Sequence, residues 1–196
     1  MHQDTPAAGS IRPTKDVDAI VDVTSYAKYD ALSERLRELG LVEDTSEGAP
    51  LCRWRYRKII VDVMPTIESV LGFSNRWYPR AIETAQRHDI AGFNVRIVTP
   101  ALFVATKLEA FHGRGGNDIF ASHDLEDIIT LVDGRQEIVD DVATADDEVS
   151  AYIATEMGAL LKNPDFKEAL AGFLLPDAAS QARRSTLEQR LVALTR

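Results

Sequence analysis

Apolar and polar residues alternate along the start of the chain and then recur at helical spacing. Between residues 16 and 23 every second residue is apolar, which is the period of a β-strand with one buried face. Over residues 25–40 the period changes to three or four, and this predicts a helix that Thr24 or Ser25 caps and Gly40 ends. The apolar positions of that helix are Tyr29, Leu32, Leu36 and Leu39.

Further strands are predicted in the middle of the chain. Residues 51–65 contain two runs rich in β-branched and aromatic residues, separated by a turn near Arg57 and Lys58 and closed by Pro65. A helix is expected after Pro79, through residue 88, and "FNVRIV" is typical of another strand. The expected order is therefore β-α-β-β-α-β.

The second half of the chain is predicted to be helical. Thr99 followed by Pro100 favours a helix start, and that helix is expected to reach about His112. "GRGGND" is a loop, Ser122 caps the next helix, and the pattern stays helical to the end. We therefore expect an α+β fold. Residues 1–98 would form a core with a small mixed sheet and flanking helices, and residues 99–196 an all-α region packed on it.

Composition narrows the class of protein. A chain of 196 residues with 45% hydrophobic and 27% charged residues is typical of a globular domain. No apolar run approaches the roughly 20 residues of a membrane span, and the N-terminus lacks a signal-peptide pattern. One cysteine, Cys52, suits a reducing cytoplasm, and four scattered histidines give no zinc spacing. A net charge of −9 disfavours non-specific binding to nucleic acid across the whole surface.

Two acids open the first predicted strand, and their charge must be offset if the strand enters a core. Asp16 and Asp18 share a face because residues two apart in a strand point the same way. Asp62 lies late in a later strand, and would join them if the two strands are neighbours. A divalent cation would offset the repulsion, and three hard oxygen ligands suit Mg²⁺ or Mn²⁺. Each acid alone also fits a solvent-facing or strand-end residue.

Two separated motifs are similar to those of one protein family. "GSIRPTKDVDAIVDV" resembles the strand motif of the polymerase-β-like nucleotidyltransferases, and more narrowly that of the AbiEii-type abortive-infection and toxin–antitoxin family. "KLEAFHGRGGNDIFASHDLEDI" is similar to a later motif of that family. The resemblance covers residues 9–135. Matching positions are Gly9, Arg12, Thr14, Asp16, Asp18 and Asp62, then Lys107, Ala110, Arg114, Asp124 and Asp127.

The resemblance implies transfer of a nucleoside monophosphate from an NTP to a hydroxyl group, on RNA, by a toxin-like protein. A cognate antitoxin is a candidate partner whose existence the sequence leaves open. Asp16 and Asp18 would hold both metal ions, Asp62 one of them, and Lys107 would contact phosphate. Asp124 would orient Lys107. The remaining nucleotide-binding positions that it implies are Gly9, Ser10, Arg12, Thr14 and Arg114.

Other hypotheses stay open at this stage. Family members carry an upstream helix with a Gly-Gly pair, and only eight residues precede Gly9, so a protein that binds nucleotide or a partner without turnover is the alternative. A metal nuclease is weaker, because no lysine follows Asp62 in "VMPTIES".

A run of alternating basic and aromatic residues, "RWRYRK", offers a second kind of surface. It places Arg53, Arg55 and Arg57 on one strand face, either as an RNA-contacting surface or as a solvated face with its aromatic residues turned inward.

Overall fold

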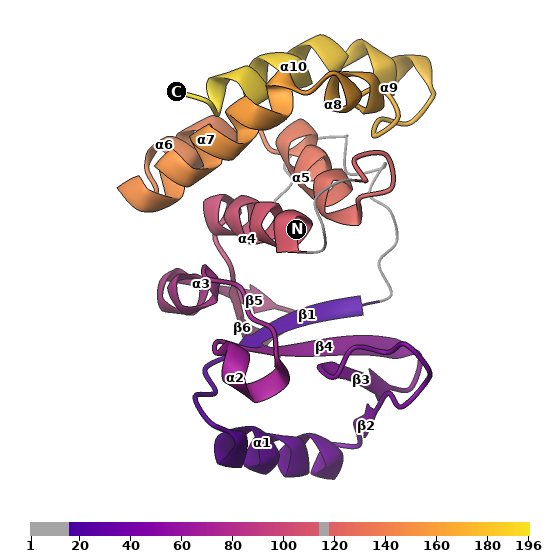
Figure 1. Ribbon diagram of the computed structural model, residues 1–196, viewed down its shortest axis with the longest axis vertical. Helices are drawn as coiled ribbons and strands as arrows, with labels where there is room; N and C mark the ends of the chain where they lie inside the picture. The colour runs from indigo at the N-terminus through magenta and orange to yellow at the C-terminus, as the bar shows by residue number, and fades with distance from the viewer. Residues whose placement is uncertain (1–15, 114–117) are drawn as a thin grey trace. The chain divides into compact units, whose positions relative to one another are not determined.

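The structure is a computed structural model that describes residues 16–113 and 118–196 (Figure 1). These residues fall into two compact units, one ending at Ala85 and the other containing Gln86–Arg196. The boundary expected from the sequence, between residues 98 and 99, lies inside the second unit. Each unit is described separately below. Together they contain a small mixed sheet and a helical C-terminal part, so the predicted α+β class is confirmed.

The first unit is built on a four-stranded sheet with the order β1-β4-β3-β2. The pair β1–β4 is parallel, whereas β4–β3 and β3–β2 are antiparallel, so the sheet is mixed. The helix α1 covers one face of it (Figure 1). The bounds are β1 Asp16–Val21, α1 Tyr26–Glu38, β2 Val42–Glu43, β3 Arg53–Tyr56 and β4 Ile59–Pro65.

Local signals explain where α1 begins and ends. The Ser25 side chain accepts a hydrogen bond from the backbone N–H of Lys28, which satisfies one of the donors that the first helical turn leaves open. Gly40 follows the helix with φ of +86°, a left-handed conformation that glycine adopts without strain. Both predicted helix ends are confirmed.

Two short helices complete this unit, and the second is shorter than predicted. α2 spans Glu68–Leu71 and α3 spans Tyr78–Thr84, so the expected extension of α3 through residue 88 is wrong. Residues Gln86–Ile90 form strand β5 instead. The core of the unit consists of Val23, Cys52, Trp54, Val63, Val70, Trp77 and Ala81, all buried.

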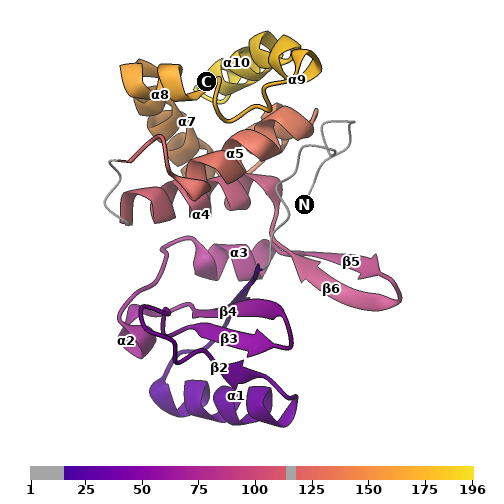
Figure 2. The same cartoon turned by 90° about the vertical axis from the view of Figure 1, so that its right-hand side faces the viewer.

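The second unit begins with a β-hairpin. Strand β5 pairs antiparallel with β6, Phe93–Ile97, as a two-stranded ribbon separate from the four-stranded sheet (Figure 2). Ala91 and Gly92 connect the strands with φ of +52° and +83°, which is the backbone of a two-residue hairpin turn. The predicted strand at 93–98 is therefore present, but it pairs with residues 86–90, for which the sequence pattern predicts the end of a helix.

Helices make up the rest of the second unit, as the sequence predicts. α4 starts at Pro100, and the Ser122 hydroxyl caps α5 by accepting from the backbone N–H of Leu125. Val104, Leu108 and Val132 lie in the fully buried core between the helices. The bounds are α4 Pro100–Gly113, α5 His123–Gly134, α6 Ile138–Ala143, α7 Asp147–Lys162, α8 Pro164–Ala169, α9 Ala178–Ala182 and α10 Arg184–Ala193.

Charged contacts hold the last helices to α5. Arg183 forms a pair with the buried carboxylate of Asp133, with Nη2 2.9 Å from Oδ2. Arg190 donates to the backbone carbonyls of Val132 and Asp133 at 2.8 and 2.7 Å, where the end of a helix leaves acceptors open. Among the described helices, none has the length and apolar character needed to cross a membrane.

Candidate functional site

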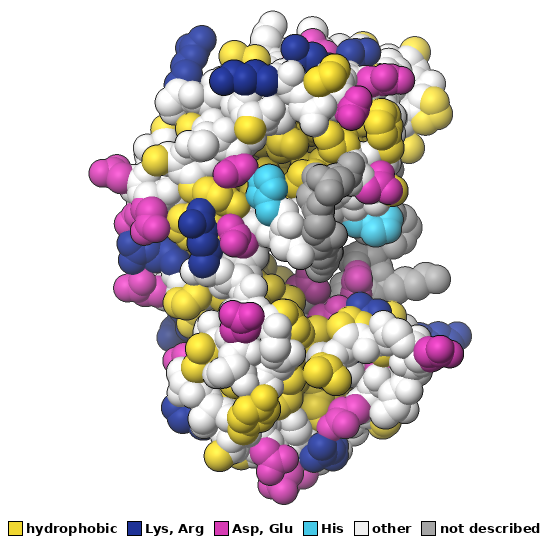
Figure 3. Space-filling view, in the orientation of Figure 1, with side chains coloured by type: hydrophobic (Ala, Val, Ile, Leu, Met, Phe, Trp, Pro, Cys, Tyr) yellow, Lys and Arg dark blue, Asp and Glu magenta, His cyan; other side chains and the backbone are white. Residues whose placement is uncertain are grey.

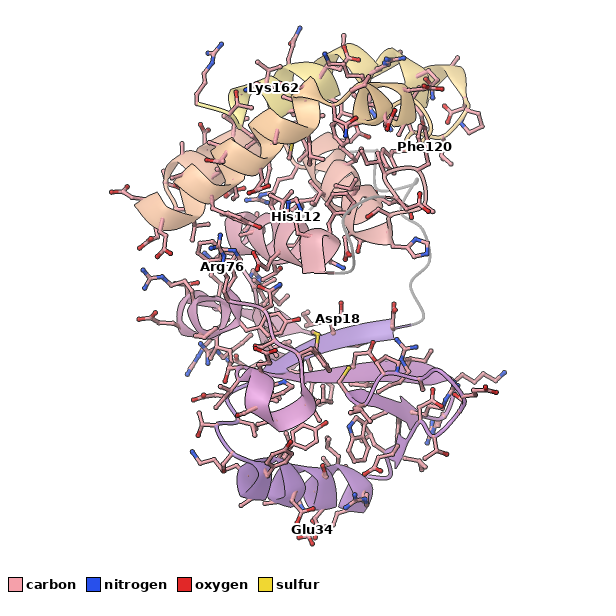
Figure 4. All side chains as sticks on the ribbon, viewed as in Figure 1. Asp18, Glu34, Arg76, His112, Phe120 and Lys162 are labelled. Atoms are coloured by element: carbon pink, nitrogen blue, oxygen red, sulfur yellow. The ribbon has the colours of Figure 1, made fainter. Side chains whose placement is uncertain are left out.

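The register between β1 and β4 brings acidic residues from distant parts of the chain together. Asp18 lies directly beside Asp62 in the parallel pair, and neighbours at the same register position point to the same side of a sheet. Asp16, two residues before Asp18, shares that face. In Figure 4, the labelled Asp18 stands on the face of β1 that is turned away from α1. The sequence predicts that the three acids meet only if the strand of Asp62 lies beside the first strand. This pairing is confirmed.

An arginine on the next strand neutralises part of this charge. Arg53 of β3 is the cross-strand neighbour of Asp62, and its Nε and Nη2 donate to the two carboxylate oxygens at 2.9 and 2.7 Å. Asp62 is only 8% exposed. These hydrogen bonds raise the pKa of Arg53, and the negative charge of Asp16 adds to the effect. Two parallel hydrogen bonds between charged groups make this the strongest kind of side-chain pair.

The positions of these acidic side chains can be compared with the predicted metal site. In the described parts of the chain, no three histidine, cysteine or acidic side chains form a group arranged to hold a metal ion. The carboxylates of Asp16, Asp18 and Asp62 are the right donors for Mg²⁺ or Mn²⁺. Both oxygens of Asp62 accept from Arg53, and each keeps a second lone pair, so a metal ion on this face would share Asp62 with the guanidinium. The metal site stays a prediction that requires Asp62 to share or exchange its partner.

Cys52 lies next to Arg53, and its surroundings favour the protonated thiol. Its side chain is buried, and burial raises the pKa of the thiol to about 11, with the negative charges of Asp62 and Asp18 adding to the shift. Only the thiolate is a strong nucleophile. At neutral pH the thiol stays protonated and acts as a small apolar group under the acidic face.

The remaining arginines of "RWRYRK" have different environments. Arg55 shares the face of Arg53 and pairs with Asp44, with Nη2 2.7 Å from Oδ2. Arg57 lies outside the strand with φ of +55°, so its predicted place on the strand face is wrong: it belongs to the turn. Trp54 is buried on the opposite face of the sheet. RNA contact by this segment is untested and stays a prediction.

Acidic pH is expected to weaken the first unit through Asp44. Hydrogen bonds from Arg55 and Ser46 lower the pKa of Asp44 from 3.8 to about 2. A carboxylate whose pKa is lower in the folded state contributes stability above its unfolded pKa, and loses it as the pH falls from about 4 to about 2. Urea unfolding of wild type and of Asp44→Asn measures this: the difference between the two midpoints should be largest above pH 5 and vanish near pH 2. A difference independent of pH would contradict the assignment.

The second unit contains the predicted phosphate contact, Lys107 of α4. Its Nζ lies 2.6 Å from Oδ2 of Asp127 and 3.7 Å from Oδ1 of Asp124, both on α5. The centre of the Phe103 ring lies 5.6 Å from the same nitrogen, which stands over the ring. The structure thus brings Lys107 and Asp124 together as predicted, and shows that Asp127 is the closer partner. Residues three apart on a helix share a face, so the spacing of Asp124 and Asp127 in the sequence indicated that Asp127 could also reach Lys107.

Several predicted residues lie outside the described residues. They are Gly9, Ser10, Arg12, Thr14 and Arg114. Their predicted contacts with nucleotide stay predictions.

Comparison of the chain with protein-family models, with curated proteins and with solved structures found no match. The resemblance to the AbiEii-type family therefore rests on the motifs alone, and the class that the fold defines is an α+β protein with an acidic face on a small mixed sheet.

Proposed function

We propose that the protein is a metal-dependent nucleotidyltransferase that moves a nucleoside monophosphate from an NTP to a hydroxyl group, with RNA as the acceptor. The observation that supports this most is the register of β1 with β4, which sets Asp18 beside Asp62 and leaves Asp16 on the same face. Three acids on adjacent strands match the motif that suggested the family. By the same resemblance, we propose a toxin-like protein of the cytoplasm with a cognate antitoxin.

Each residue has a distinct role in this proposal. Asp16, Asp18 and Asp62 would hold Mg²⁺, which would lower the pKa of the attacking hydroxyl and stabilise charge on the phosphates. Arg53 holds Asp62 in one orientation through its two hydrogen bonds. Lys107, restrained by Asp127 and Asp124, supplies a positive charge for a phosphate group.

A second candidate function is binding of nucleotide or a partner without turnover. It is favoured by one observation: the guanidinium of Arg53 already occupies both oxygens of Asp62. An arginine that offsets the charge of Asp62 makes it a weaker ligand for a metal ion, so such a site can bind an NTP through other groups without turnover. Nothing in the described residues favours the nuclease, the third class considered from the sequence.

One assay separates these functions. The purified protein is incubated with Mg²⁺, each α-³²P-labelled NTP in turn and total RNA, and the RNA is resolved on a denaturing gel. Label in the RNA supports transfer. Label that stays with the protein in a filter assay but does not enter RNA supports binding without turnover. Absence of label from the RNA and from the filter, with all four nucleotides, would contradict both transfer and nucleotide binding. Shortened RNA would indicate a nuclease.

A further inference from the structure

Strand β5 has a neighbouring strand on one side only, among the residues that the structure describes. It pairs with β6 in a two-stranded sheet, and Figure 2 shows this ribbon projecting beyond α4, the helix that follows it. A two-stranded ribbon by itself is marginally stable in water, and it gains stability when further strands join it. The N–H and C=O groups along an unpaired edge are a template for such a strand.

The hairpin turn determines which backbone groups of β5 face the open edge. Ile90 and Phe93 flank the two-residue turn, so they exchange both of their backbone hydrogen bonds. Hydrogen-bonded pairs alternate along an antiparallel ladder, so His88 is bonded to β6 as well. The backbone groups of Arg87 and Asp89 therefore point to the open edge, where an added strand would bond to them.

Arg87 and Asp89 carry opposite charges on that edge. Both are exposed, and because they are two residues apart they lie on the same face of the ribbon. Arg87 forms no ion pair with any residue that the structure describes, and its cross-strand neighbour in the ribbon is another cation, Arg96. Oδ1 of Asp89 accepts a hydrogen bond from the backbone N–H of Gly92, which leaves Oδ2 available to a cation.

A second copy of β5 satisfies both charges in one register. When the two strands run antiparallel about a two-fold axis at His88, Arg87 of each copy lies opposite Asp89 of the other. An axis at Arg87 would set the two arginines opposite each other, and an axis at Asp89 the two aspartates. Like charges directly opposite each other destabilise a sheet. The sequence from Arg87 to Asp89 is therefore complementary to itself about His88.

The charge of the whole chain does not favour the association of two copies. With a net charge of −9, they repel each other at long range. Figure 3 shows acidic and basic side chains interspersed over the face of the molecule that it draws. An electrostatic attraction between copies therefore requires a local match, such as the one on β5.

We propose that two copies of this chain associate through β5, which pairs antiparallel with β5 of the second copy and joins the two ribbons into one sheet of order β6-β5-β5-β6. Arg87 and Asp89 of each copy hold the strands together through their charges and their backbone hydrogen bonds. An edge of five residues buries less surface than a standard interface, so the dimer is weak and depends on concentration. No residue of the acidic face takes part, nor does Lys107, so this inference stands if the proposed function fails.

Exchange of the two charges tests the pairing. Arg87→Asp leaves two acids on the edge and Asp89→Arg leaves two bases, so each variant should self-associate at least about tenfold more weakly than wild type. A mixture of the two variants should dimerise, because each acid then faces a base of the other chain. The double variant Arg87→Asp/Asp89→Arg restores both pairs with reversed charges and should self-associate like wild type. Sedimentation equilibrium over a range of concentrations measures every sample, and circular dichroism with urea unfolding checks that the variants are folded.

Hydrogen exchange of wild type locates the interface without any substitution. In concentrated samples the amide N–H groups of Arg87 and Asp89 should exchange more slowly than in dilute ones, because they gain partners in the dimer. The amides of Asn94 and Arg96, on the other edge of the ribbon, should be unchanged, and slower exchange there instead would indicate pairing through β6 and contradict the proposal.

The sedimentation results can also overturn the proposal. A wild type that stays monomeric at about 1 mM would do so, and Arg87 and Asp89 would then be charges that keep the edge from pairing. Equal self-association of wild type and both single variants would place the interface elsewhere. A mixture of folded single variants that fails to dimerise would show that the two charges do not meet.

Discussion

Asp18→Asn is expected to lower the rate of nucleotide transfer by at least about a hundredfold, the usual loss when a principal charged group is removed from such a site. Asparagine keeps the shape of the side chain but loses the negative charge that a metal ion requires. The folded state should be unchanged or slightly more stable, because Asp18 lies beside Asp62 and their mutual repulsion disappears. The measurement is incorporation of label into RNA, with thermal unfolding of both proteins in parallel.

Asp22→Asn is the matched control for this prediction. Asp22 follows the end of β1 and is exposed, so it has the same chemistry but no neighbour at the register of Asp62. It should transfer nucleotide at the wild-type rate. Full activity in Asp18→Asn, or an equal loss in both variants, would show that the acidic face is not the site of the reaction.

The elements that the sequence predicted well carry strong local signals. Ser25 and Ser122 cap α1 and α5, and Gly40 ends α1, because the hydrogen bonds and backbone angles at these positions involve residues close in the chain. The segment that became β5 has no such signal. Its strand state depends on pairing with β6 across the Ala91–Gly92 turn, and a tertiary partner outweighed its weak helical pattern.

The candidate site was predictable in part. The alternation of side chains along a strand was enough to place Asp16 and Asp18 on one face. The pairing of β1 with β4 joins residues far apart in the chain, so the sequence could only suggest that Asp62 joins them if the two strands are neighbours. The pair between Arg53 and Asp62 was within reach. The predicted turn at Arg57 and Lys58 sets the register of the hairpin, and counting outward from it leads to Arg53 opposite Asp62.

The contacts of Lys107 could not be predicted in the same way. Asp124 and Asp127 are three residues apart and lie on one face of α5, so either can approach a lysine from α4. Which one is closer depends on how the two helices pack, and the spacing in the sequence contains no information about it. The structure was needed to identify Asp127 as the closer partner.

Arg53→Met should destabilise the protein by about 2–4 kcal/mol, because it leaves the carboxylate of Asp62 buried without its cation. Methionine retains much of the apolar length of the arginine side chain, so the loss reports charge and hydrogen bonds more than packing. Arg35→Met is the control for an exposed pair: the side chains of Arg35 and Glu38 are 67% and 64% exposed, and the variant should lose less than about 1 kcal/mol. Urea unfolding at pH 7 measures both. Equal losses would mean that the Arg53–Asp62 pair behaves as a surface pair.

The same variant tests whether the acidic face can hold a metal ion once its arginine is gone. Mg²⁺ should raise the unfolding midpoint of Arg53→Met more than that of wild type, because Asp62 is then available to join Asp16 and Asp18, and a ligand stabilises only the state that binds it. Adding Asp18→Asn to this variant should remove the effect. If Mg²⁺ stabilises neither protein, the guanidinium of Arg53 is the cation that this face evolved to hold, and binding without turnover becomes the better account of the site.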